Sequence, residues 1–181
     1  MNRRTIFPLF ALLLFCGGSA KSQQKCDCTL FPRDPDYCVK ECALKALNLA
    51  TPLELKVNLH FDPKVVVVVK KARKNGPITS LDNLRESLTA DQFSKLEKSV
   101  NSEEGVKPIF AREEKILGDV SQKTLEDKYK LDTETARGIV DAREDKSGGR
   151  MTLEDLKTKL SDAQIQKVQT AIAGESMKQP D

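Results

Sequence analysis

Apolar residues recur with helical spacing along this chain, and the second half repeats the pattern of the first. The offset between the copies is 70 residues as far as Arg73 and Arg143, and 72 residues beyond them. Polar positions have drifted while the apolar spacing is kept, which is typical of a duplicated structural unit. The matched apolar positions, which predict the core of each unit, are Leu55, Phe61, Val66, Val69, Leu81, Leu84, Leu88, Phe93 and Leu96 in the first copy and Leu125, Leu131, Ala136, Ile139, Leu153, Leu156, Leu160, Ile165 and Val168 in the second.

Each copy predicts short helices joined by tight turns. Thr51 is a suitable cap for a helix that begins at Pro52. The valines at 65–69 favour a strand locally, but the twin segment 134–144 has a helical pattern, so the duplication predicts a helix in both copies. A short helix and a closing helix complete each copy, at 80–84 and 89–100 in the first and at 152–156 and 161–172 in the second.

Residues 1–20 have the layout of a secretory signal peptide, with two arginines, an apolar stretch and a small-residue exit at Ala20. The apolar stretch is too short to span a bilayer, and no later segment is apolar enough to do so. We therefore expect an exported protein, periplasmic or secreted, without a membrane span. A lipid anchor at Cys16 is the less favoured alternative, because Phe15 stands where a lipoprotein signal usually has a small residue.

Charge and aromatic content narrow the classes of function. The chain has 30 basic and 27 acidic side chains. Removal of the signal leaves a net charge of about +1, which gives no overall attraction to nucleic acid or to an anionic membrane. The chain has no Trp and few other aromatic residues, which argues against a large aromatic pocket. Positive charge is concentrated between Lys56 and Lys74, whereas the matching stretch of the second copy mixes both signs.

Four cysteines follow the predicted signal, namely Cys26, Cys28, Cys38 and Cys42. Segment 37–49 predicts a helix that places the last two one turn apart on the same face. Direct pairing of the first two is disfavoured, because the single residue between them is too tight for normal disulfide geometry. Two disulfides, each joining one cysteine of the first pair to one of the second, are therefore favoured in an exported protein, and both crossings remain open. A tetrathiolate zinc site is the alternative, although the spacing is not the usual Cys-x2-Cys.

A longer string in the first copy matches a known repeat. It reads N-x-A-T-P-x-E-L, then a turn, a helix that ends in A-R, and N-G-P-x-x-S-L-D-N-L. This string resembles the helix-hairpin-helix repeat of ComEA-type competence proteins over residues 47–100, and residues 117–172 share the resemblance through their likeness to the first copy. The resemblance implies sequence-nonspecific binding of double-stranded DNA outside the cytoplasm. It is carried by Asn48, Ala50, Thr51, Pro52, Glu54, Leu55, Ala72, Arg73, Asn75, Gly76, Pro77, Ser80, Leu81, Asp82, Asn83 and Leu84.

The hairpin turns depart from that family. Family hairpins usually read glycine, an apolar residue, glycine, and the glycines allow backbone N–H groups to approach a DNA phosphate at a helix N-terminus. The aligned residues lack both glycines in both copies and place an aspartate where the phosphate would arrive. We expect these aspartates to be helix N-caps and the central apolar residues to be retained for packing. The two turns are His60, Phe61 and Asp62 in the first copy and Lys130, Leu131 and Asp132 in the second.

We predict an all-α protein in which a disulfide-clamped N-terminal helix precedes two tandem helix-hairpin-helix-like units. The predicted layout is a signal peptide at 1–20, a cysteine-rich segment and helix at 21–46, the first unit at 47–100, a linker at 101–115, the second unit at 116–173 and a tail at 174–181.

No enzyme, cofactor or metal motif is evident. His60 is the sole histidine, and it lacks a nucleophile or carboxylate pair at a useful spacing.

Two functional hypotheses remain. Binding or scaffolding of an unknown protein partner is favoured, and DNA binding by the basic helix of the first unit is the alternative. Arginine recurs at the same place in both copies, which indicates a structural task such as bonding helix-end carbonyls. The candidate phosphate contacts are Lys64, Lys70, Lys71, Arg73 and Lys74.

Overall fold

The computed structural model describes residues 26–28, 36–146, 148 and 150–174. The predicted signal peptide and Cys16 lie outside these residues. The prediction of an all-α fold is confirmed, because every regular element in the described residues is a helix. In the same residues, no helix has the length and apolar character needed to cross a membrane.

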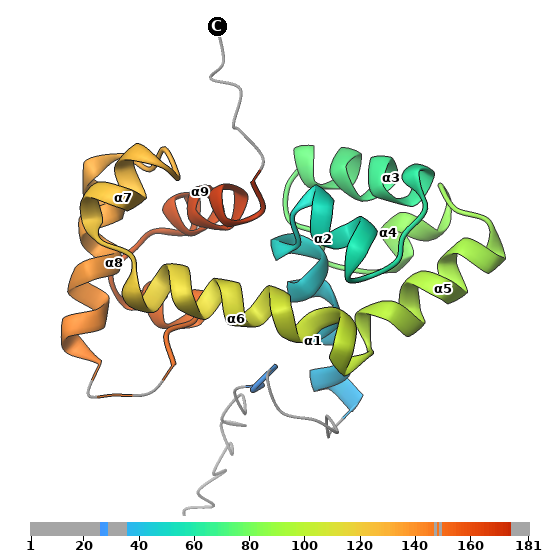
Figure 1. The fold of residues 1–181 in the computed structure, drawn as a ribbon, viewed down its shortest axis with the longest axis horizontal. Helices are drawn as coiled ribbons and strands as arrows, with labels where there is room; N and C mark the ends of the chain where they lie inside the picture. The colour runs from blue at the N-terminus through green and yellow to red at the C-terminus, as the bar shows by residue number, and fades with distance from the viewer. Residues whose placement is uncertain (1–25, 29–35, 147, 149, 175–181) are drawn as a thin grey trace, which may run out of the picture.

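The helices follow the same order twice. Those of the first half are α1 (Asp36–Leu49), α2 (Pro52–Val57), α3 (Pro63–Lys74), α4 (Asp82–Arg85) and α5 (Ala90–Val100). Those of the second half are α6 (Glu103–Asp119), α7 (Gln122–Asp127), α8 (Thr133–Asp145), the 3-10 helix η1 (Leu153–Thr158) and α9 (Asp162–Ile172). Figure 1 shows α6 crossing the middle of the molecule, with α7, α8 and α9 on one side and α2 to α5 on the other. The predicted linker 101–115 therefore lies almost entirely within α6, which takes the place in the second half that α1 takes in the first.

Local caps explain where the helices begin. Thr51 Oγ1 accepts the N–H of Glu54, and the carboxylate of Glu54 accepts the N–H of Thr51, which forms a capping box. Matched boxes open the two closing helices, with Thr89 at α5 and Ser161 at α9. The valine run is helical, as predicted, because Val65, Val66 and Val69 are buried on one face of α3 and tertiary packing overrides the local strand preference.

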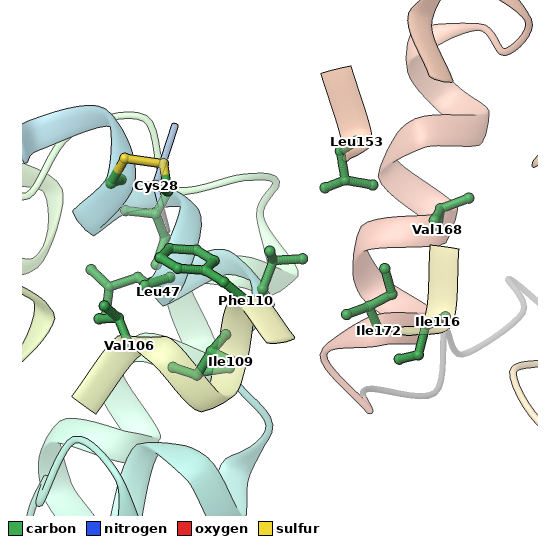
Figure 2. Close-up of a cluster of buried hydrophobic side chains, with 14 of the residues drawn as sticks. Cys28, Leu47, Val106, Ile109, Phe110, Ile116, Leu153, Val168 and Ile172 are labelled. Atoms are coloured by element: carbon green, nitrogen blue, oxygen red, sulfur yellow. A yellow bond between two sulfur atoms is a disulfide. The ribbon is translucent and has the colours of Figure 1, made fainter. Parts of the chain in front are cut away.

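The core contains nearly all of the predicted apolar positions. Leu81, Leu88 and Ile165 are exceptions, since they are only partly buried and pack against the edge of the core. Sequence reasoning missed the central contribution of α1 and α6, where Leu47, Leu49, Val106, Ile109 and Phe110 are almost fully buried. Figure 2 shows several of these side chains in one cluster with Cys28. Helix α1 packs against α5, α6 and α9, so both halves share a single core.

Two disulfides clamp the N-terminal segment to α1. Cys26 is bonded to Cys38 and Cys28 to Cys42, which resolves the open connectivity. The zinc alternative is wrong, because all four sulfur atoms are in disulfide bonds. Cys28 and Cys42 are both buried in the core, and the second disulfide is therefore also a packing element.

Candidate interaction surface

The two hairpin turns keep a glycine-like backbone without glycine. His60 has φ of 52° and Lys130 has φ of 56°, in the left-handed region that L side chains rarely adopt. The next residue in each turn closes the hairpin, since the N–H of Phe61 donates to Leu55 O at 2.9 Å and the N–H of Leu131 donates to Leu125 O at 3.2 Å. Both copies therefore share a left-handed turn that is closed by the same backbone hydrogen bond and contains no glycine.

Asp62 occupies the helix N-terminus where the family resemblance would place a phosphate. Its Oδ1 accepts the N–H groups of Lys64 at 2.9 Å and Val65 at 3.0 Å, and its Oδ2 accepts Gln92 Nε2 at 3.1 Å. The hydrogen bond from Val65 is the main influence that lowers the pKa of Asp62. The carboxylate therefore already supplies negative charge at this end of α3.

Asp132 caps the N-terminus of α8 in the same way as Asp62 caps α3. Its Oδ1 accepts the N–H of Thr135 at 2.8 Å, and its Oδ2 lies 3.1 Å from Lys167 Nζ. The hydrogen bond from Thr135 is the largest influence on the pKa of Asp132, which is lowered to about 2. An anion that approaches either hairpin would meet a carboxylate instead of free N–H groups.

Arg73 does not belong to the outer surface of α3. Its guanidinium donates to the carbonyl oxygens of Leu47 and Ala50 at the C-terminal end of α1, the latter at 2.7 Å. Arg143 repeats this contact in the second half and donates to Ile116, Leu117 and Val120 at the end of α6, as its 70-residue offset requires. Burial lowers the pKa of Arg143. Both arginines secure a helix end, and Arg73 is not available as a phosphate contact.

The remaining lysines of α3 lie beside exposed apolar residues. Lys64, Val67, Lys71 and Lys74 are exposed and follow one another at spacings of three and four residues, so they share one side of the helix. Lys70 is half-buried and lies next to this stripe. We use the term α2–α3 face for the exposed residues Leu53, Lys56, Val57, Lys64, Val67, Lys71 and Lys74.

Three apolar side chains distinguish this face from the rest of the described surface. Leu53 is 69% exposed, Val57 56% and Val67 63%, and no other large apolar side chain in the described residues is exposed to such a degree. Single exposed apolar residues are ordinary, whereas exposed apolar residues that gather in one patch mark interaction sites. The two helices pack directly against each other, so these residues lie on one hairpin.

The second unit shows which residues occupy the matching positions in the other copy. We use the term α7–α8 face for the residues at the 70-residue offset from the α2–α3 face. All three exposed apolar residues are replaced by charged residues there, and all four lysines are replaced by acids. The α7–α8 face consists of Lys123, Glu126, Asp127, Glu134, Arg137, Asp141 and Glu144. The exposed apolar character is therefore specific to the first unit, and comparison of the two copies at their offset could have revealed it from the sequence.

A cavity of about 460 Å³ between the two halves is the other candidate for a binding site. Several of its charged residues form ion pairs with one another. Lys45 lies 2.9 Å from the buried Glu113, and Lys146 lies 2.8 Å from Asp155. Burial raises the pKa of Glu113, and Lys45 opposes this effect. The polar groups of the cavity hold the junction together, which leaves the α2–α3 face as the stronger candidate.

His60 is exposed on its turn. No group of three histidine, cysteine or acidic residues in the part of the chain that the structure describes could hold a metal ion.

Comparisons of this chain with models of protein families, with curated proteins and with solved structures gave no match. Function is therefore inferred from the surface itself.

Proposed function

We propose that this chain is a non-enzymatic, exported binding protein whose α2–α3 face docks another protein. The observation that carries the proposal is the exposure of Leu53, Val57 and Val67 among lysines on one hairpin. Burial of such side chains in a complex releases about 1.5–3 kcal/mol for each one that becomes fully covered. The lysines around them select a partner whose contact segment is acidic and carries apolar side chains.

The two disulfides support location outside the reducing cytoplasm, where such bonds persist. They agree with export by the signal predicted at 1–20. A periplasmic or secreted location is part of this proposal.

Site-specific photo-crosslinking tests the proposal in exporting cells. A photoreactive phenylalanine analogue replaces Val67 in one strain and Lys98, an exposed residue of α5 outside both faces, in a control strain. We expect a discrete protein adduct from position 67 and none from position 98. The proposal is wrong if position 67 forms no protein adduct while the chain is exported and folded.

DNA binding is the second candidate, because Lys64, Lys71 and Lys74 form an exposed basic stripe and the first unit resembles the competence family. Asp62 weighs against it, since its carboxylate caps the hairpin helix. A gel shift with long double-stranded DNA at low and at moderate salt separates the two functions. Retention that weakens steeply with salt and is lost when the three lysines are replaced by alanine would favour DNA.

A further inference from the structure

The two units carry opposite charges at matching positions. Lys56 corresponds to Glu126, Lys64 to Glu134, Lys71 to Asp141 and Lys74 to Glu144. Within each pair, both residues occupy the same place in the same order of helices. Four exchanges of lysine for acid therefore separate two faces that are built on one backbone plan.

We propose that the partner of the α2–α3 face is the α7–α8 face of a second copy of this chain. This inference rests on the proposed function, since it names the protein that docks there. Opposite charges at matched positions are the complementarity that steers and orients such contacts. No foreign partner is needed to supply the acidic segment that the lysines select.

The spacing of the charges fits a helix-on-helix contact. On α3 the lysines stand at 64, 71 and 74, and on α8 the acids stand at 134, 141 and 144, with the same intervals. When the two helices lie parallel in this register, each lysine is opposite an acid and Val67 is opposite Arg137. Val67 would pack against the aliphatic part of Arg137, whose charged end can reach solvent.

The arrangement of the molecule allows both faces to be used at once. Figure 1 shows α3 and α8 toward opposite ends of the molecule, with α6 running between the two halves. The faces share no residue, and Glu134 and Glu144 are exposed, as are Lys64, Lys71 and Lys74. A contact between two different faces is heterologous, so copies add head to tail into a chain or ring.

The strength of the association follows from the exposure of the charges. Each exposed ion pair contributes little and is screened by salt. Association is therefore weak, increases with protein concentration and decreases steeply as salt is added.

Analytical ultracentrifugation of the disulfide-intact chain tests the inference. At about 20 mM salt, where screening is weak, we expect the average mass to rise with concentration to twice the monomer mass or more. At about 500 mM salt we expect monomers. The double substitutions K71E/K74E and D141K/E144K should each weaken self-association by roughly tenfold or more. K95E/K98E, on exposed positions of α5, is the matched control and should leave association unchanged.

Mixing the two reversed variants is the decisive step. K71E/K74E keeps an unchanged α7–α8 face and D141K/E144K keeps an unchanged α2–α3 face, so the mixture should form hetero-complexes that neither variant forms alone. Helix content from circular dichroism confirms that each variant is folded. A chain that stays monomeric at low salt, or a mixture that stays monomeric, overturns the inference.

The photo-crosslinking at Val67 separates the two levels of the proposal. An adduct between two copies of the chain supports both the binding function and its partner. An adduct with a different protein keeps the proposed function and overturns self-association. Absence of any protein adduct overturns both, and DNA retention in the gel shift then identifies nucleic acid as the occupant of the face.

Discussion

Arg112 binds Glu54 through two parallel hydrogen bonds, from Nε to Oε1 and from Nη2 to Oε2, each 2.7 Å long. The same guanidinium donates to Leu49 O at 2.8 Å and to Ile172 O at 2.6 Å, at the ends of α1 and α9. One side chain of α6 therefore joins three helices, of which α1 and α2 belong to the first half. Neither residue has a counterpart in the other copy, since the offset places Cys42 and Thr124 at those positions.

Replacement of Arg112 should destabilise the fold more than replacement of an ordinary surface cation. We expect R112M to lower the free energy of unfolding by about 2–4 kcal/mol, because Glu54 and two helix-end carbonyls lose their donor in a mostly buried site. R112K keeps the charge but not the planar fork, so its loss should be about half as large. Urea unfolding measures both. K107M, at the exposed pair with Glu103, is the control and should change stability by no more than about 0.5 kcal/mol.

The ionisation of Glu54 should make stability depend on acidity. Burial by itself would raise the pKa of Glu54, but the hydrogen bonds and charge of Arg112, with the Thr51 N–H, outweigh it and lower the pKa below 4.5. The unfolded chain therefore takes up this proton at a higher pH than the folded chain does. The stability contributed by the carboxylate is fully present above pH 4.5 and is lost as the pH falls through the folded pKa.

Unfolding experiments between about pH 6 and pH 3 test this dependence. The wild type should lose stability across the interval, and E54Q should lose less, because its side chain does not titrate. Parallel curves for the two proteins would show that Glu54 does not contribute to acid sensitivity.

Glycine at the hairpin turns should stabilise the protein. His60 and Lys130 have left-handed backbones, so H60G and K130G should each raise the free energy of unfolding by about 0.5–1 kcal/mol through relief of strain. N58G is the matched control, because Asn58 has φ of −85° in the right-handed region, and it should destabilise the fold by up to about 1 kcal/mol. Thermal unfolding of the three variants measures these changes, and a loss of stability in H60G and K130G would contradict the prediction.

The two disulfides should differ in their contribution to stability. They close loops of similar length, with sequence separations of 12 and 14 residues, so each should contribute about 3 kcal/mol through the unfolded chain. Cys28 and Cys42 also pack in the core. Replacement of Cys28 and Cys42 by serine should therefore cost more than replacement of Cys26 and Cys38, because it also places hydroxyls among apolar side chains. Equal losses in urea unfolding would contradict this ranking.

The duplication made most of the helices predictable. Val65 to Val69 would be assigned to a strand from local preference alone, and the twin segment corrected that assignment. The recurrence of Arg73 and Arg143 indicated a structural task, and their acceptors lie at the ends of α1 and α6, two helices earlier in the chain and not on their own helices. Repetition supplied the long-range information that a single copy lacks.

The remaining features left no such signal. Helix α6 begins with exposed acids and contains Pro108, and its likeness to α1 is confined to a few positions, so it was predicted as a linker. The contact between Arg112 and Glu54 spans 58 residues and occurs once, so no repeat could indicate it. The charge exchange between the two faces is visible in the sequence, but only the structure shows that six of the eight residues are exposed and that Glu126 and Asp141 are half-buried.

The anchoring of Arg143 on α6 redefines where a minimal fragment can be cut. A truncation that starts at residue 116 would retain its carbonyl acceptors but delete most of the helix that orients them. A fragment that starts at residue 103 retains the whole anchor. Deletion mapping of this chain should therefore place its breakpoint before Glu103, at the start of α6, whereas the predicted unit boundary at residue 116 falls inside that helix.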